Sequence, residues 1–146
     1  MKIVLDKGAK MPTRAHETDA GYDLYAVHDF NVKRSRTRSN GRANVGSRVH
    51  DTGVHIEIPI GYVGFIKSKS GLNVKHGLTA EGVIDSGYTG SIVVKLYNHT
   101  PNNYHVKAGD KIAQLVILPI ITPDLELVDS LEETERGDGG FGSTGR

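Results

Sequence analysis

Five residues, Val54-His55-Ile56-Glu57-Ile58, alternate apolar and polar side chains and stop at Pro59. Alternation with a period of two is typical of a β-strand that buries one face. Further β-rich runs lie at 3–5, 62–66, 91–97 and 111–118, and helical periodicity is confined to a turn or two around 72–76. The pattern therefore predicts an all-β fold, a barrel or jelly roll of many short strands.

The size and composition indicate a single globular domain. The chain has 146 residues, of which 37% are hydrophobic and 24% are charged. No apolar run approaches the roughly 20 residues that cross a bilayer. The opening stretch Met1-Lys2-Ile3-Val4-Leu5-Asp6 meets a charge too early for a secretory signal. The absence of Cys excludes a disulfide, a thiolate nucleophile and Cys-ligated zinc, and it fits an intracellular protein.

Two segments depart from the strand pattern. Six bases lie in a window that contains no acid: Lys33, Arg34, Arg36, Arg38, Arg42 and Arg48. The other 12 bases face 17 acids, so the rest of the chain carries a net charge of −5. Residues 130–146 are acidic and then Gly-rich, and such a tail buries too little apolar surface to order itself. We therefore expect a β domain, 1–129, that carries an exposed loop or long polar hairpin at 33–50, and a Gly-rich C-terminal flap, 130–146.

The tail from Arg136 to Gly145 combines glycines, an arginine, two hydroxyls and an aromatic ring. Glycine N–H groups can converge on an anion, and the other groups add donors and a ring that stacks on a base. This composition suits a phosphate cradle. Because the strand-and-helix context of a Walker loop is missing, a closing flap would have to grip the nucleotide. A plain Gly-rich end is the alternative, and on composition alone it is the more common case.

Two carboxylates stand where acid–base or metal chemistry would be useful. Asp85 ends an apolar run and is followed by a turn that carries Tyr88. A carboxylate in a partly dry pocket can act as a general base on water, whereas an Asx-turn ahead of Gly87 is the structural alternative. Asp23 lies inside the β-rich stretch 20–26. An inward-facing acid there needs a partner, either a hydrated Mg²⁺ or a capping or salt-bridging group.

Two further stretches offer polar groups to an anion. In Lys67-Ser68-Lys69-Ser70-Gly71-Leu72, two cations alternate with two hydroxyls ahead of an expected helical turn. Such a stretch suits an anion site, and a solvated basic turn is the alternative. Gln114 falls among apolar neighbours in the stretch 109–114, and a buried amide needs partners.

Taken in order, these five stretches resemble the five sequence motifs of the trimeric dUTP pyrophosphatases. The resemblance spans residues 20–145 at family-like spacing, and its third and fifth motifs, around Asp85 and at 136–145, are the most specific. It implies a jelly-roll-like (β-clip) homotrimer in which each active site is built from all three subunits. It also implies hydrolysis of dUTP to dUMP and pyrophosphate with Mg²⁺. That reaction keeps uracil out of DNA and supplies dUMP for thymidylate synthesis, in the cytoplasm of a cell or of a viral host.

The resemblance also assigns a role to each motif. Asp85 would activate the attacking water, Tyr88 would pack on the deoxyribose and exclude a 2′-OH, and Asp23 would engage Mg²⁺ through water. Backbone groups of a hairpin at roughly 78–93 would read uracil and reject thymine and cytosine; this slot includes Val83, Ile84 and Val93. The α- and β-phosphates and the water would be held by Lys69, Ser70, Gly71 and Gln114. The flap that closes over the γ-phosphate and the uracil, from a neighbouring chain, would consist of Arg136, Phe141, Gly142, Ser143 and Thr144.

Three features depart from the family pattern. Lys69 stands where the second motif usually has Arg, so the charge is kept and the bidentate fork is lost. Thr79 stands about where many relatives place an Asn that contacts uracil, which affects side-chain recognition of the base and not backbone recognition. The basic stretch 33–48 has no counterpart in the motifs.

Two other functions are alternatives. A dCTP deaminase would need a proton-shuttling carboxylate beside the pyrimidine 4-position, and the 136–144 tail matches the pyrophosphatases better. A protein that acts by binding is the alternative from a different class, either a nucleotide-gated regulator or a nucleic-acid binder that uses Arg34 to Arg48. A basic loop without interleaved aromatics is usually just solvated, so that explanation of 33–48 is preferred on the sequence.

Overall fold

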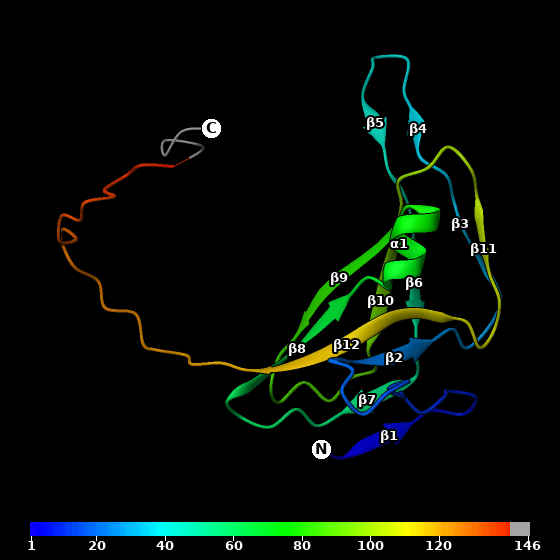
Figure 1. Ribbon diagram of the computed structural model, residues 1–146, viewed down its shortest axis with the longest axis horizontal. Helices are drawn as coiled ribbons and strands as arrows, with labels where there is room; N and C mark the ends of the chain where they lie inside the picture. Colours follow the sequence, from blue (N-terminus) through cyan, green and yellow to red (C-terminus); the bar gives the residue numbers. More distant parts are fainter. Residues whose placement is uncertain (141–146) are drawn as a thin grey trace.

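The computed structural model describes residues 1–140 and consists mostly of short strands (Figure 1). The elements in chain order are β1 (Ile3–Leu5), β2 (Gly21–Tyr25), β3 (Phe30–Val32), β4 (Arg36–Thr37), β5 (Ala43–Asn44), β6 (Gly46–Asp51), β7 (Val54–Ile56), β8 (Tyr62–Lys67), α1 (Ser70–His76), β9 (Leu78–Ile84), β10 (Val93–Asn98), β11 (Tyr104–Val106) and β12 (Lys111–Pro119). In this range no helix is long and apolar enough to cross a membrane.

Six of the strands form one sheet, in the order β2-β12-β8-β9-β10-β6, and every neighbouring pair is antiparallel. The nine-residue β12 lies between β2 and β8. Three two-stranded sheets, β1-β7, β3-β11 and β4-β5, complete the fold. The large sheet curls into a half-barrel (Figure 1).

The core is aliphatic and draws on several strands of the large sheet. Leu24, Ile66, Leu96 and Leu115 come from β2, β8, β10 and β12, and all four are fully buried. Burial of one such side chain contributes about 1.5–3 kcal/mol relative to leaving it in water. Along β10 buried and exposed residues alternate, so one face of the strand meets the core.

The all-β prediction is confirmed, and several expected runs coincide with strands. The run at 3–5 is β1, and β8 and β12 each extend one residue beyond the runs at 62–66 and 111–118. β7 ends at Ile56, earlier than the alternating stretch suggests, although the Glu57 N–H still donates to the Lys2 carbonyl (3.0 Å). The turn expected around 72–76 is α1, which ends at Gly77 in the left-handed conformation (φ 58°). Jelly-roll closure and a trimer stay predictions.

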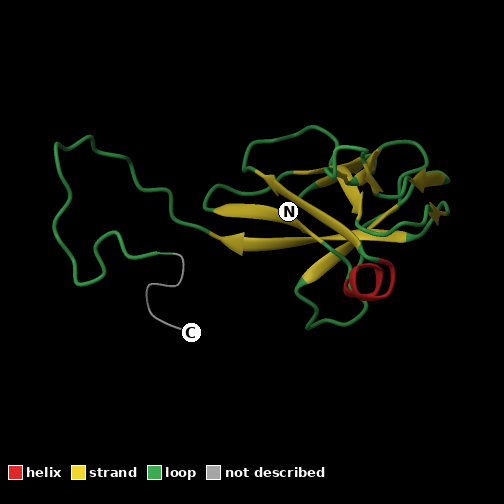
Figure 2. Cartoon of the chain, turned by 90° about the horizontal axis from the view of Figure 1, so that it is seen from above, coloured by secondary structure: helices red, strands yellow, loops and turns green. Residues whose placement is uncertain are grey.

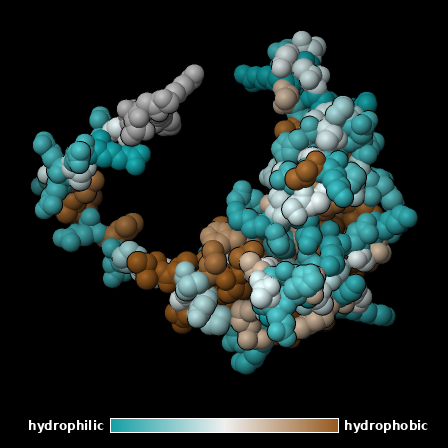
Figure 3. Space-filling model, in the orientation of Figure 1, coloured by the Kyte–Doolittle hydropathy of each residue, from teal (hydrophilic) through white to brown (hydrophobic). Residues whose placement is uncertain are grey.

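Beyond β12 the chain leaves the body as an extended arm, residues 120–140 (Figures 1 and 2). Within the described residues, its last backbone hydrogen bond to the body runs from the Ile120 N–H to the Gly61 carbonyl (2.9 Å). Ile121, Leu125 and Leu127 are 91%, 99% and 100% exposed, and apolar side chains gather where the arm begins (Figure 3). An apolar run of this kind gains stability only when another surface covers it.

Candidate functional site

Three neighbouring strands place polar side chains in one row across the sheet. Gln114 on β12 is paired with Asp23 on β2 and, on its other side, with Lys67 on β8. Residues directly opposite each other in antiparallel strands point to the same face. The Gln114 amide Nε2 donates to the carbonyl of Ser68 (3.2 Å), so the strand end of β8 is held against this row. The first, second and fourth sequence motifs therefore meet here.

Asp23 is the buried charge of this group, with only 4% of its surface exposed. Its Oδ1 accepts from the Lys69 ammonium and its Oδ2 pairs with the Lys111 ammonium at 2.6 Å. Burial raises the pKa of the Asp23 carboxyl, but hydrogen bonds from the two lysines outweigh that effect, and the pKa lies below its usual value. The carboxylate is therefore held ionised between two cations.

Lys111 is a member of this group that the sequence analysis missed. It lies in the stretch 109–114, of which only Gln114 was predicted as a site residue. The available signal was a base at the start of a strand that pairs with the strand of Asp23. A β-bulge between Lys111 and Ala113 shifts the register there, and the strand pattern does not predict it.

Lys69 and Ser70 sit where β8 passes into α1. Lys69 has extended backbone angles ahead of the helix, and Ser70 is the first helical residue. The preceding Ser68 fixes this junction, because its Oγ accepts from the Ala80 N–H (3.0 Å) and donates to the Ala80 carbonyl (3.2 Å). Gly71 follows, and a Cβ there would meet no atom within 4 Å. The junction is thus anchored on β9, while Ser70 and Gly71 stay open.

Asp85 follows β9 directly and opens a tight turn. The Tyr88 N–H donates to the Asp85 carbonyl (3.2 Å), and Gly87 takes a positive φ of 84°, which glycine adopts without strain. The Tyr88 ring lies over Gly90, where a Cβ would collide with it, and its hydroxyl donates to the Ser91 carbonyl (3.0 Å). Asp85 and Tyr88 are both exposed. The third motif therefore presents a carboxylate and an aromatic ring on one fixed turn.

The two strands that flank this turn separate along most of their length. β9 and β10 are paired only at their far end, from Leu78↔Asn98 to Ala80↔Leu96. Beyond that point residues 81–84 pair with β8, and residues 93–95 pair with β6. Alternate residues of 81–84 therefore turn their N–H and C=O groups towards an open slot between the strands. Val83 and Val93, 58% and 44% exposed, lie on the two sides of the split, and Ile84 is half-buried at its end.

One chain does not bring Asp85 to the lysine–aspartate row. Glu81 is level with Lys67 across the β8–β9 pair, and Asp85 lies four residues further along. At about 3.3 Å per residue, this is a separation of roughly 13 Å along the strand. The candidate site is thus two half-sites, one around Asp23, Lys69 and Gln114, the other around Asp85 and Tyr88.

The fifth motif lies on the arm, apart from both half-sites. Arg136 opens a turn in which the Gly139 N–H donates to its carbonyl (3.0 Å) and its Nε donates to the Gly139 carbonyl (3.1 Å). Phe141, Gly142, Ser143 and Thr144 lie outside the described residues. Across residues 1–140, no cluster of three or more His, Asp or Glu side chains is arranged to hold a metal ion.

Comparison with known proteins identifies relatives across the whole chain. The dUTPase family model matches residues 7–145. The deoxyuridine 5′-triphosphate nucleotidohydrolase of Yarrowia lipolytica is 43% identical, over 97% of this chain and 85% of the relative. Its counterpart from Paramecium bursaria Chlorella virus 1 is 44% identical, over 97% and 94%. A solved dUTPase of Staphylococcus bacteriophage 80alpha with dUpNHpp superposes with a TM-score of 0.85, at 32% identity over 99% of this chain and 98% of the other.

Proposed function

Since this chain belongs to the dUTPase family, we propose that it hydrolyses dUTP to dUMP and pyrophosphate. The observation that carries the proposal is the pair of half-sites: cations and an amide suited to phosphates on one, a carboxylate, an aromatic ring and an open backbone slot on the other. Hydrolysis of dUTP would keep uracil out of DNA and supply dUMP for thymidylate synthesis. A cytoplasmic setting belongs to the same proposal.

In the phosphate half-site, the Asp23 carboxylate loses one of its two lysine partners when the triphosphate binds. Lys69 and Ser70 bind the α- and β-phosphates, and Gln114 orients them and the attacking water. Lys69 has to turn from Asp23 to the phosphate, which on its own would strand a buried charge. Lys111 remains on the other carboxylate oxygen, 2.6 Å away, and keeps Asp23 paired. Lys111 thus acts as a positioning residue for Lys69.

The slot between β9 and β10 binds the base. Free N–H and C=O groups along 81–84 match the acceptor and donor edge of uracil, and a narrow slot leaves no room for the methyl group of thymine. The exocyclic amine of cytosine would face a donor. Tyr88, fixed over Gly90, packs on the deoxyribose and excludes a 2′-OH. Thr79 lies at the paired end of the hairpin, away from the slot, and its hydroxyl is hydrogen-bonded to His99 (2.8 Å). Its side chain is therefore not available to the base, and backbone groups carry base recognition.

Asp85 is the general base that takes a proton from the attacking water. Its distance of roughly 13 Å from the level of Lys67 supports a site completed by another chain. We therefore assign the protein a cyclic homotrimer, in which Asp85 and Tyr88 of one subunit face Asp23, Lys69 and Gln114 of a neighbour. The arm gives independent support, because Leu125 and Leu127 need a surface that one chain does not offer.

The tail at the end of the arm closes the site. Arg136, Ser143 and Thr144 would clasp the γ-phosphate, Phe141 would lie over the uracil, and Gly142 would allow the backbone to approach the phosphates. Closure excludes water and fixes the triphosphate for in-line attack. The arm leads away from its own body (Figure 2), which supports a tail that serves the site of a neighbouring subunit.

The donor set fits Mg²⁺ that arrives with the triphosphate, not an ion that the protein holds alone. Both Asp23 oxygens are engaged by ammonium groups, and the residues described supply no further carboxylate cluster. Asp23 would therefore meet the hydrated ion through water, beside Gln114. When bound, the ion neutralises charge on the phosphate oxygens. A similar dUTPase structure, from phage phi11, has a Mg(II) ion that is described as structural, which is a different kind of site.

Pyrophosphate release from each dNTP and from UTP, with and without Mg²⁺, tests the proposed function. We expect turnover of dUTP alone, and strong dependence on Mg²⁺. Conversion of dCTP to dUTP or dUMP would instead indicate a deaminase. Binding of dUTP without any pyrophosphate release would indicate a nucleotide-gated regulator.

A further inference from the structure

The basic segment forms a hairpin that projects from the body, between β3 and β6 (Figure 1). β4 and β5 pair through Arg36↔Asn44 and Thr37↔Ala43, and the surface of this projection is hydrophilic (Figure 3). All residues from 33 to 44 except Ser35 are exposed. None of them belongs to either half-site, so the proposed hydrolysis does not account for them.

The hairpin has defined geometry at its tip. The Gly41 N–H donates to the Arg38 carbonyl (2.9 Å), and the Arg38 N–H donates to the Arg42 carbonyl (2.8 Å). Gly41 takes a φ of 76°, and the Asn40 side chain accepts from the Arg42 N–H (3.1 Å). A turn closed by a left-handed glycine is a standard connection of a three-residue hairpin loop. The sequence therefore encodes a hairpin at this point and not a featureless loop.

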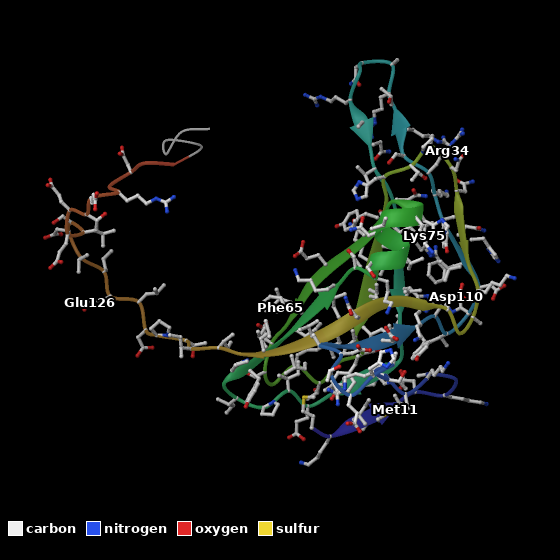
Figure 4. All side chains as sticks on the ribbon, in the orientation of Figure 1. Met11, Arg34, Phe65, Lys75, Asp110 and Glu126 are labelled. Carbon is white, nitrogen blue, oxygen red and sulfur yellow. The ribbon has the colours of Figure 1, made fainter. Side chains whose placement is uncertain are left out.

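The root of the hairpin is fixed to the body. Ser35 donates through its Oγ to the Asn98 carbonyl (2.6 Å), and its N–H donates to the Thr100 carbonyl (2.9 Å). The Arg34 N–H donates to the Asn103 side chain (2.9 Å), and Figure 4 marks Arg34 where the hairpin begins. Gly46 closes the other side, because a Cβ there would collide with the Lys33 carbonyl.

The pairing within the hairpin places two of the arginines on one face. Arg36 and Thr37 alternate along β4, and Arg38, whose N–H donates to the Arg42 carbonyl (2.8 Å), returns to the face of Arg36. Side chains two residues apart along an extended strand repeat at about 6.6 Å. Arg36 and Arg38 therefore present two guanidinium groups on one face of the ribbon, each available to contact a phosphate.

Nothing in the described part of the chain neutralises this charge. No ion pair within residues 1–140 includes any of the six bases from Lys33 to Arg48, whereas Lys2, Lys67, Lys69 and Lys111 all have acidic partners. Five of these bases, Lys33 to Arg42, lie on the projection itself, and keeping five like charges there costs free energy, which an anionic ligand would offset. No aromatic residue lies between 33 and 48, so the hairpin has no ring on which unpaired bases stack.

We propose that the β4–β5 hairpin binds the phosphate backbone of double-stranded nucleic acid, without base specificity. A two-stranded ribbon has dimensions that a major groove admits, and the arginines supply the phosphate contacts. The sequence alone favoured a solvated loop. A solvated loop does not explain why hydrogen bonds fix both the tip and the root of this hairpin. This binding site is separate from both half-sites and does not depend on hydrolysis of dUTP.

Fluorescence anisotropy with a labelled 24-base-pair duplex tests the proposal on the full chain. The test variant carries Arg→Gln at 34, 36, 38 and 42. The matched control carries Lys→Gln at four exposed body positions, Lys2, Lys7, Lys10 and Lys107, and so has the same net charge. With about four phosphate contacts, affinity for the wild-type chain should fall roughly 10²-fold between 50 and 200 mM salt. The hairpin variant should lose most of this affinity and salt dependence, and the control should keep them.

Four outcomes would overturn the proposal. Two are no binding by the wild-type chain at 50 mM salt and equal loss of affinity in the two variants. The third is equal competition by a poly-glutamate of the same charge, which would indicate an acidic protein surface as the partner. The fourth is equally tight binding of single-stranded dT, which would rule out a duplex as the ligand. Both variants should retain dUTP hydrolysis, which shows that they fold. If the wild-type chain lacks that activity, the proposed function fails while the binding result stands.

Discussion

Two inactive variants of this protein should restore activity when their subunits are mixed. Asp85→Asn removes the general base and Lys69→Met removes a phosphate contact, so each variant alone should lose activity, by about 10²–10⁴-fold for the base. In one chain the two residues lie on half-sites roughly 13 Å apart along β9. If one subunit supplies Asp85 and its neighbour supplies Lys69, a mixed trimer contains some intact sites.

The expected recovery follows from counting subunits. In a cyclic trimer assembled at random from equal amounts of the two variants, each site draws Asp85 from one chain and Lys69 from the next. A site is intact when the first chain carries Lys69→Met and the second carries Asp85→Asn, which has a probability of about one quarter. Mixed samples should therefore reach about a quarter of wild-type kcat, measured as pyrophosphate release at saturating dUTP.

Subunit exchange has to be shown in the same sample. We would denature and refold the mixture, and show by capture through a tag on one variant that the other variant is retained with it. The assay itself uses the unfractionated mixture, to which the value of about one quarter applies. A mixture of Asp85→Asn with Asp85→Ala, refolded in the same way, is the matched control and should stay inactive. Activity at the background of the single variants in verified mixed trimers would refute the shared site, because it would mean that each chain completes its own.

Four further predictions follow from individual contacts. Asp85→Asn alone should keep the fold and dUTP binding while turnover falls about 10²–10⁴-fold; near-native turnover would show that another group is the base. Tyr88→Ala should reduce the dUTP-to-UTP ratio of kcat/KM more than it reduces Tm, and Tyr88→Phe, which keeps the ring over Gly90, should leave that ratio unchanged. Deletion of 136–146 should leave the Tm of the ligand-free protein nearly unchanged, because Arg136 bonds only within its own turn in the described residues. The deletion should remove most of kcat and weaken dUMP binding less, and a large drop in Tm would contradict this prediction. His50 is buried against Phe30, and burial lowers its pKa from 6.5 to about 4. Between these pH values the unfolded chain binds more protons than the folded chain, so the free energy of unfolding should fall as pH drops below 6.5, by about 3 kcal/mol at pH 4. Urea titrations of His50→Gln should show a shallower decline with pH, and an equal decline in the wild-type chain and the variant would rule His50 out as the cause.

Much of the fold was predictable because the strands that form the core are also the apolar, β-rich runs of the sequence. β8 and β12 lie on apolar runs that bury Ile66 and Leu115 in one core, so propensity and burial agree. β3, β6 and β11 were not predicted, and β4 and β5 were covered only by the expectation of an exposed loop or long polar hairpin at 33–50, because β4 and β5 have two residues each and bury nothing. Their pairing depends on turn geometry and on contacts such as Ser35 with Asn98, which no periodicity in the sequence encodes.

The candidate site was predictable as a set of residue types and not as an arrangement. Motif order pointed to Asp23, Lys69, Asp85 and Gln114, but Lys111 emerges only from the pairing of β12 with β2 across a bulge. The slot between β9 and β10 was predicted from the family resemblance, at roughly 78–93, and not from the residue pattern, because strand propensity continues along both strands while their pairing stops at Ala80. Which strand a backbone group faces is decided by the neighbours that β8 and β6 provide. The same sheet that packs the core also leaves the slot open: β8 and β6 each pair with one strand of this hairpin, and under the proposed function the backbone groups left unpaired between the two strands are those that would select the base.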